Sequence, residues 1–151
     1  MPVFLKPVLK MQTVTVRTHQ RILRDVLKES MVDHLEHRMP GHFEQGAERK
    51  YNYRKRSSKY LKRKLRKVGH QIPLVYTGRT KRDLIASKHR ITGTQHKARL
   101  YYRNYFPLKN DQRIEIERVL LSEVRDIAKF VARRYAQECR KPHNQIKRRR
   151  G

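Results

Sequence analysis

The middle of the chain carries a block of positive charge that cannot supply a hydrophobic core, because Lys and Arg are almost never fully buried without partners. Residues 49–103 hold 19 Lys and Arg side chains against one acid, Asp83. The flanks differ, since residues 1–48 and 104–139 each carry seven bases and six acids. Residues 140–151 add six bases and no acid. The pattern predicts nearly neutral flanks that build the fold, around a basic central segment.

Composition limits the size of the core and the class of protein. The chain has 151 residues, a net charge of +26, 36% hydrophobic residues and no Trp. This length suits one domain, which we place at residues 1–139, with residues 140–151 as a basic C-terminal tail. No apolar run approaches the ~20 residues of a membrane helix. The apolar stretch within residues 1–10 is shorter than the hydrophobic region of a secretory signal peptide. Cys139 is the single cysteine, which excludes an intramolecular disulfide framework.

Both flanks contain apolar residues at helical spacing. Thr18 is the expected N-cap of a first helix that Pro40 and Gly41 end. A second long helix is expected from Asn110 or Asp111 to Pro142. Neither apolar stripe could stay exposed, so we expect the two helices to pack together. The residues expected at their contact are Ile22, Val26, Leu27 and Leu35 on the first helix and Leu120, Val124, Ile127 and Val131 on the last.

The central block predicts one further helix. Ser57 or Ser58 is a suitable N-cap, and Gly69 is in the usual position for ending a helix after Val68. The expected apolar face is Tyr60, Leu61, Leu65 and Val68. Residues 41–54 show no clear period and predict a loop.

Three segments have the character of strands. Val14 and Val16 alternate with Thr and Arg, which predicts a short half-buried strand. Ile72 to Tyr76 is apolar around a Pro and predicts an extended edge segment. Residues 88–103 resemble a hairpin. The expected fold class is therefore α+β, with two main amphipathic helices packed on a small antiparallel sheet.

The run from Arg49 to Lys67 has 11 basic residues in 19 and no acid. Such a continuous positive face suits phosphate contacts with release of counterions. Tyr51, Tyr53 and Tyr60 lie within it and could stack on bases or pack on the protein. The alternatives are a solvated face or a contact with acidic protein surfaces. The candidate polyanion contacts are Arg54, Lys55, Arg56, Lys59, Lys62, Arg63, Arg66 and Lys67, with Arg148, Arg149 and Arg150 of the tail.

Residue patterns typical of catalysis or metal binding are weak. No Gly-rich phosphate loop or nucleophile elbow occurs. His34 and His37 share a helical face, as do Cys139 and His143, but a zinc site needs three or four ligands. We therefore expect no enzymatic activity, no metal and no cofactor.

The segment from Pro73 to Arg79 is the most informative motif. We expect its glycine, Gly78, to adopt a positive φ and the turn to project Arg79, Lys81 and Arg82 together. Arg79 or Arg82 could pair with Asp83, or Arg79 could contact another subunit or DNA.

The same segment resembles a motif of tailed-phage virion morphogenesis and neck proteins, which carry Pro-Leu, two residues, Thr-Gly-Arg-Leu-Arg and a small residue before Ile. Pro73, Leu74, Thr77, Gly78 and Arg79 match this motif. The departures are Thr80 for Leu, Asp83 for the small residue and Leu84 for Ile, and the family's frequent Trp is missing, with Tyr53 the nearest aromatic residue. The order of elements is similar over residues 18–135, with residues 104–108 standing before the last helix as in the family.

What this resemblance implies is a structural virion protein of the head–tail junction, a ring-forming neck or tail-completion subunit without chemistry. Its partners would be copies of itself, neighbouring virion proteins and packaged DNA, with no membrane. It would be located in the virion after assembly in the host cytoplasm.

A basic nucleic-acid-binding protein of a ribonucleoprotein, such as a ribosomal protein, is the alternative. The sequence pI near 11.0 and the interleaved Tyr residues suit it, whereas the near-neutral flanks favour packing between proteins. A ring former should assemble with its own kind, and a ribosomal protein should be monomeric without RNA.

Overall fold

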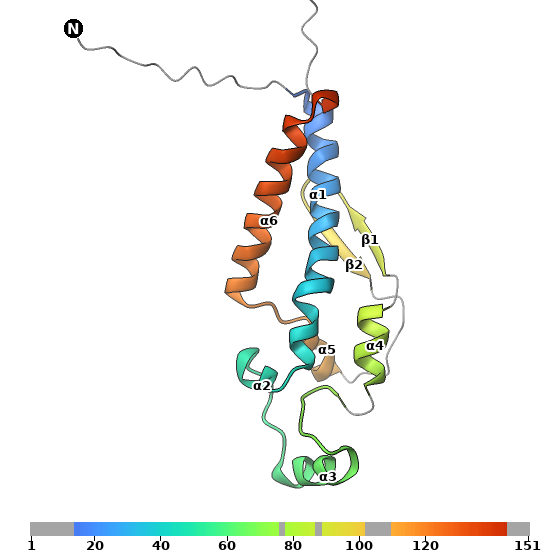
Figure 1. Ribbon diagram of the computed structural model, residues 1–151, viewed down its shortest axis with the longest axis vertical. Helices are drawn as coiled ribbons and strands as arrows, with labels where there is room; N and C mark the ends of the chain where they lie inside the picture. Colours follow the sequence, from blue (N-terminus) through green and yellow to red (C-terminus); the bar gives the residue numbers. More distant parts are fainter. Residues whose placement is uncertain (1–13, 76–77, 87–88, 102–109, 145–151) are drawn as a thin grey trace, which may run out of the picture.

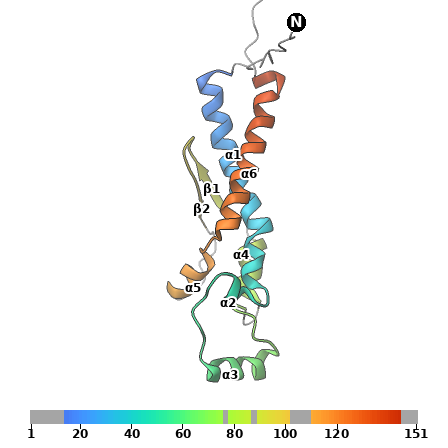
Figure 2. The ribbon, with the colours of Figure 1, turned by 90° about the vertical axis from the view of Figure 1, so that its left-hand side faces the viewer.

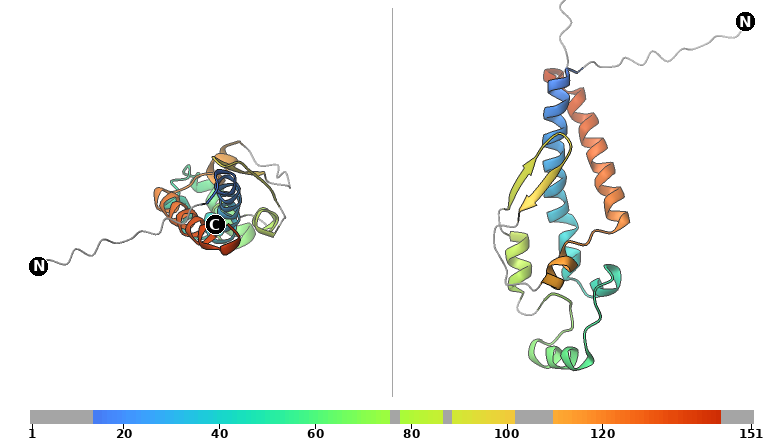
Figure 3. Two further views of the ribbon diagram at one scale, coloured as in Figure 1. Left: turned by 90° about the horizontal axis from the view of Figure 1, so that it is seen from above. Right: turned by 180° about the vertical axis from the view of Figure 1, so that it is seen from behind.

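The computed structural model describes residues 14–75, 78–86, 89–101 and 110–144. Two long helices dominate it, α1 (Val16–His37) and α6 (Leu121–Arg140), which run in opposite directions side by side. A hairpin of β1 (Arg90–Gly93) and β2 (Ala98–Tyr101) packs against α1. Helix α1 therefore lies between α6 and the hairpin (Figure 3). The predicted α+β class, with helices on a small antiparallel sheet, is confirmed.

Helix α1 begins earlier than the sequence indicates. Thr15 is its N-cap, and the Thr15 hydroxyl accepts a hydrogen bond from the Thr18 N–H at 3.2 Å. The strand expected at Val14 and Val16 is wrong, because Val16 is the first residue of the helix and is 72% exposed. Thr18 as N-cap is also wrong, since a cap at Thr15 already satisfies a free N–H of the first turn.

The contact between α1 and α6 is confirmed, although its residues differ in part. The buried row of α1 is Ile22, Val26, Ser30 and His34, at four-residue steps. Val124 of α6 is 49% exposed, so its predicted place in the contact is wrong. Two other predicted members pack elsewhere: Leu35 lies against Met39, Phe43, Leu84 and Ile116, and Leu120 lies against Ala47, Tyr51 and Tyr53.

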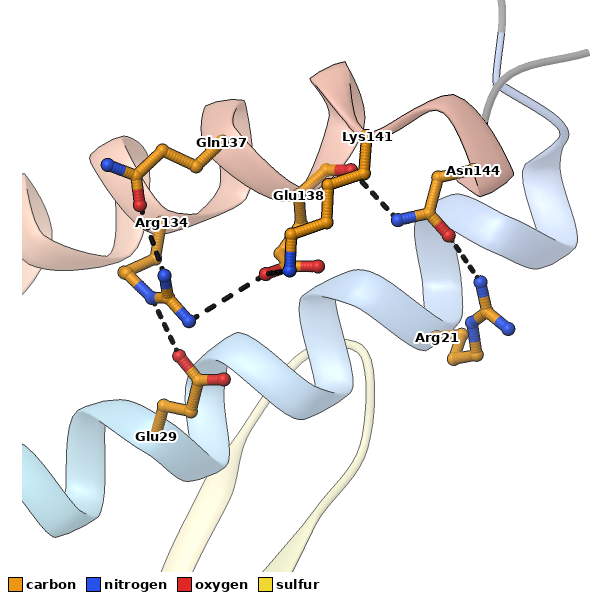
Figure 4. A network of polar contacts seen from close by, with 7 residues as sticks. All are labelled: Arg21, Glu29, Arg134, Gln137, Glu138, Lys141 and Asn144. Carbon is orange, nitrogen blue, oxygen red and sulfur yellow. Dashed lines mark hydrogen bonds and ion pairs between the residues drawn. The ribbon is translucent and has the colours of Figure 1, made fainter.

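Polar contacts join α1 to the second half of α6 and to the segment after it (Figure 4). The Arg134 Nε donates to the Glu29 carboxylate at 2.8 Å, and the Arg21 guanidinium donates to the Asn144 Oδ1 at 2.5 Å. Asn144 belongs to a short 3₁₀ helix, η2 (Pro142–Asn144), which follows α6. The predicted end of the last helix at Pro142 is thus confirmed.

The hairpin has the expected antiparallel pairing. Its register places Arg90 opposite Tyr101 and Gly93 opposite Ala98. The turn is closed by the Thr94 N–H, which donates to the Lys97 carbonyl at 2.8 Å. Residues 88, 102 and 103 of the predicted hairpin lie outside the described residues.

Short helices replace the loop that was expected at residues 41–54. They are η1 (Met39–Phe43) and α2 (Ala47–Lys50). Met39 and Phe43 are buried with Leu84 of α4 (Arg79–Ala86) and Ile116 of α5 (Asn110–Ile116). This small core lies at the C-terminal end of α1, where Leu35 packs against it. The short elements η1, α4 and α5 each contribute one or two apolar residues to it.

The single helix predicted from residue 110 to Pro142 is wrong, because the chain leaves the helix at residues 117–120 before α6 begins. Three hydrogen bonds stabilise this non-helical segment. The Arg118 guanidinium donates to the Tyr51 carbonyl at 3.1 Å and to the Asn52 carbonyl. The Leu120 N–H donates to the Glu123 carboxylate at 3.0 Å, which starts a new helix.

The expected edge segment at Ile72 to Tyr76 is also wrong over its described part. Pro73 and Leu74 form a turn, and Leu74 has a φ of +57°. Tyr76 lies outside the described residues. Within the described ranges, no helix combines the length and the apolar character needed to cross a membrane.

Candidate polyanion-binding surface

The basic helix α3 (Ser58–Val68) forms as its terminal residues predict. The Ser57 hydroxyl accepts from the Tyr60 N–H at 3.3 Å, and Gly69 ends the helix with a φ of +76°. The Gly69 N–H donates to the Leu65 carbonyl at 2.9 Å. Local signals of this kind need no tertiary contact. Figure 2 shows α3 at the end of the molecule opposite the last turn of α6.

Most of the cations predicted for this surface are exposed on or beside α3. They face water, and together they form what we call the α3 surface: Arg54, Lys55, Lys59, Lys62, Arg63, Arg66 and Lys67. Arg56 differs, because its guanidinium binds the buried carboxylate of Glu115 and its side chain is only 28% exposed. The tail residues Arg148, Arg149 and Arg150 lie outside the described residues.

Helix α3 is rotated about its axis relative to the prediction. Leu65 was expected on the packed face but is 48% exposed, whereas Lys64 is buried at 3%. The Lys64 ammonium donates to the Ile72 carbonyl. Burial, and secondly the positive charge of Arg56, lower the pKa of Lys64. The Lys64 ammonium, and not Leu65, therefore connects α3 to the rest of the protein. Leu65 is exposed together with the cations of α3.

Glu115 of α5 anchors the segment that leads into α3. Its carboxylate accepts from the Arg54 N–H at 3.1 Å and from the Arg56 guanidinium. Hydrogen bonds from charged partners are stronger than neutral ones. This contact sets where the α3 surface lies relative to the helical pair, although α3 itself packs little on the rest of the protein.

A buried cluster of rings adjoins this anchor. His42 stacks on Tyr51 with ring centroids 3.8 Å apart, and Tyr51 stacks on Tyr53 at 5.8 Å. The Tyr51 hydroxyl donates to the Glu123 carboxylate at 2.7 Å. Burial raises the pKa of both tyrosines, and for Tyr51 the hydrogen bond to Glu123 raises it further.

Tyr51 and Tyr53 of the basic run therefore pack on the protein. Tyr51 and Tyr53 are 2% and 5% exposed, so neither ring offers a face for stacking on bases. Tyr60 is half-buried in α3. Of the two possibilities that the sequence left open, packing on the protein is the one that fits Tyr51 and Tyr53.

The predicted motif turn leads into α4. Gly78 has the expected positive φ of +74°, and its carbonyl accepts from the Arg82 N–H at 3.0 Å. Arg79 pairs with Asp83 at 3.6 Å while its side chain stays 82% exposed. Such an exposed pair is weak, so Arg79 is available to a partner. The other motif residues are spread out: Arg82 is exposed, Lys81 is half-buried, Pro73 and Leu74 form a separate turn, and Thr77 lies outside the described residues.

A cavity of about 420 Å³ lies between α3, the residues after α2 and the turn at Pro73. Its lining mixes apolar side chains such as Leu61 and Val75 with several cations, and Glu48 is the acid among them. The cavity adjoins the α3 surface and offers no group of paired acids or nucleophile with a base.

Sequence reasoning missed the two acids that organise this region. Glu115 and Glu123 are 2% and 7% exposed, although acids within helices are ordinarily surface residues. The signal for Glu123 was its place three residues after the N-cap of α6, where a Glu side chain reaches back to the cap. For Glu115 we find no local signal.

Within the described ranges, no three or more His, Cys, Asp or Glu side chains come together in a way that could hold a metal ion. Of the paired histidines, His34 is buried, whereas His37 is exposed and its ring contacts Asp33. Compared with known family models, curated proteins and solved structures, the chain matches none.

Proposed function

We propose that this protein is a structural subunit of the head–tail junction of a tailed phage, forming a ring with copies of itself and catalysing no reaction. One observation carries the proposal. Four aliphatic side chains are exposed within the short stretch where α5 meets α6: Ile114 (57%), Val119 (43%), Leu121 (67%) and Val124 (49%). Aliphatic residues that are exposed so close together in the sequence of so charged a chain favour a contact with another protein.

The order of elements supports the same proposal. A long helix, a basic segment, a glycine turn before Arg79, a hairpin and a last long helix follow one another, as they do in the neck proteins that the motif resembles. An elongated pair of helices also presents long sides, which suits repeated lateral contacts around a ring. The partner that we assign to the aliphatic residues is therefore a second copy of this chain.

In this proposal the α3 surface contacts a polyanion. A ring of many copies, each with a charge of +26, needs anions to offset its self-repulsion. Packaged DNA or acidic neighbouring virion proteins would supply them. Helix α3 stands at one end of the molecule, so the same end of every subunit would face the polyanion (Figure 1).

The test of ring formation uses the full chain. Native mass spectrometry and negative-stain electron microscopy should show a closed oligomer. Replacing Ile114, Leu121 and Val124 with Ser should give a folded monomer. A control with Val16→Ser and Val32→Ser, which are 72% and 40% exposed on α1, should keep the oligomer.

A wild-type chain that stays monomeric at high concentration contradicts the proposal. So does a control variant that dissociates as readily as the variant with Ser at positions 114, 121 and 124. A monomer that becomes ordered only with RNA would favour the ribonucleoprotein alternative. Circular dichroism separates lost assembly from lost folding in each case.

A further inference from the structure

A second basic site lies far from α3. A groove of about 1020 Å³ separates the first turns of α1 from the turn of the β1–β2 hairpin. Four cations line it, Arg17, Arg21 and Arg24 from α1 and Lys97 from the hairpin. The rest of its lining is Thr, Gln, Gly and His, and it contains no acid and no aliphatic side chain. In the ribbon, the hairpin turn lies beside the half of α1 that is remote from α3 (Figure 1).

The arginines of the groove can still receive an anion. Arg24 contacts Asp25 at 3.0 Å, but both side chains are about half exposed, and such pairs contribute little in water. Arg21 donates one N–H to Asn144 (Figure 4), which fixes the guanidinium while other donors of its five remain. The first turn of α1 carries no acid, so the positive end of the helix dipole adds to the potential here.

We infer that this groove binds the phosphate backbone of a nucleic-acid duplex. Guanidinium groups match phosphate oxygens with paired hydrogen bonds, and the Thr and Gln side chains of the lining add neutral donors. An acidic protein would need apolar side chains at the centre of its contact, and the groove has none. Interfaces with nucleic acid are more polar and more positive. The inference does not depend on ring formation.

The test compares two variants with equal loss of charge. The groove variant carries Arg17→Gln, Arg24→Gln and Lys97→Gln, all at exposed positions. The control carries Arg125→Gln, Lys129→Gln and Arg133→Gln on the exposed side of α6. Binding to fluorescent 20-base-pair DNA and RNA duplexes is followed by anisotropy between 50 and 200 mM NaCl, and far-ultraviolet circular dichroism checks the fold.

On the DNA duplex, three lost phosphate contacts should make the negative slope of log K against log salt shallower by about 2.7. For the groove variant we expect this shallower slope, together with an affinity reduced about tenfold or more at low salt. For the control variant we expect the slope to change by less than about 1. Loss on both duplexes, or on one alone, supports the site and tells which backbone fits it. Equal losses in the two variants overturn the inference.

A polyglutamate competitor decides between nucleic acid and acidic protein. If the groove substitutions weaken polyglutamate binding as much as duplex binding, the groove is a general anion surface and the inference is wrong. Oligomeric state is measured on the same samples. A wild-type chain that fails to form rings while its duplex binding depends on the groove would refute the proposed function alone.

Discussion

The apolar clusters around η1 and α2 are small. Single buried polar side chains therefore contribute strongly to the stability of this part of the molecule. Glu123 accepts hydrogen bonds from the Tyr51 hydroxyl and from the Leu120 N–H. The Tyr51 hydroxyl also leaves little room at Gly41, where a Cβ would lie 2.9 Å from the hydroxyl oxygen. One carboxylate thus joins α6 to the segment after α2.

Tyr51→Phe should be destabilising by about 1–3 kcal/mol, since the substitution leaves a buried carboxylate short of a donor. Urea unfolding followed by circular dichroism measures the change. Tyr60→Phe in α3 is the matched control and should leave the unfolding midpoint unchanged. Equal effects of the two substitutions would mean that the bond to Glu123 contributes nothing.

His42 predicts a dependence of stability on pH. Burial lowers its pKa from 6.5 to about 4, although the charge of Glu123 opposes this. Between these values the unfolded chain binds a proton that the folded chain does not, so stability falls as the pH falls from 6.5 towards 4. The loss from this residue should reach about 3 kcal/mol by pH 4.

Urea unfolding between pH 7.5 and 4.5 measures this loss. His42→Gln should flatten the dependence even if it lowers stability at pH 7.5. An unchanged pH dependence in that variant would assign the effect to other groups, such as His34, whose pKa burial also lowers.

At the scale of elements, the hairpin approaches α1 closely at one residue. A Cβ on Gly93 would lie 2.9 Å from the Lys28 Cγ and 3.2 Å from the Arg24 carbonyl oxygen. Because the second of these atoms belongs to the backbone, a side chain must push the hairpin away from the helix. Gly93→Val should therefore cost about 1–3 kcal/mol.

Thermal unfolding of Gly93→Val tests this close packing. Lys97→Val, at the exposed far end of the turn, provides a β-branched control and should have a much smaller effect. If both variants have the melting temperature of the wild type, the hairpin is free to move and does not contribute to the packed fold.

At the scale of the whole molecule, excess charge opposes compactness. Within the part of the chain that the structure describes, the exposed ion pairs are few beside the net charge of +26. Dissolved salt shortens the range of repulsion between the surplus cations. Raising NaCl from 50 to 500 mM should therefore raise the melting temperature, by roughly 3 °C for a gain near 1 kcal/mol. Scanning fluorimetry measures it, with chloride in place of sulfate because sulfate also strengthens apolar burial. A fall in melting temperature would mean that attractive ion pairs outweigh the repulsion.

Local signals accounted for the elements that depend on neighbouring residues. Ser57 and Gly69 bound α3 because a cap needs only a side chain three residues away or a left-handed residue at the end. The hairpin and the pairing of α1 with α6 followed from apolar spacing. The break at residues 117–120 could not be predicted in this way, because the carbonyls that hold Arg118 belong to Tyr51 and Asn52, far away in sequence.

The sequence by itself determined the α+β class, the two long helices and the concentration of cations in the middle of the chain, since all three arise from composition and short-range periodicity. Tertiary structure alone decided which of those cations face solvent and which are held by other parts of the protein. Arg56 and Lys64 carry the same charge as their neighbours, yet they are held by Glu115 and by the Ile72 carbonyl. Arg17 and Lys97 look unremarkable in the sequence, yet folding brings them to one groove. The physical reason is that burial and juxtaposition depend on contacts between distant segments, which a local pattern does not contain.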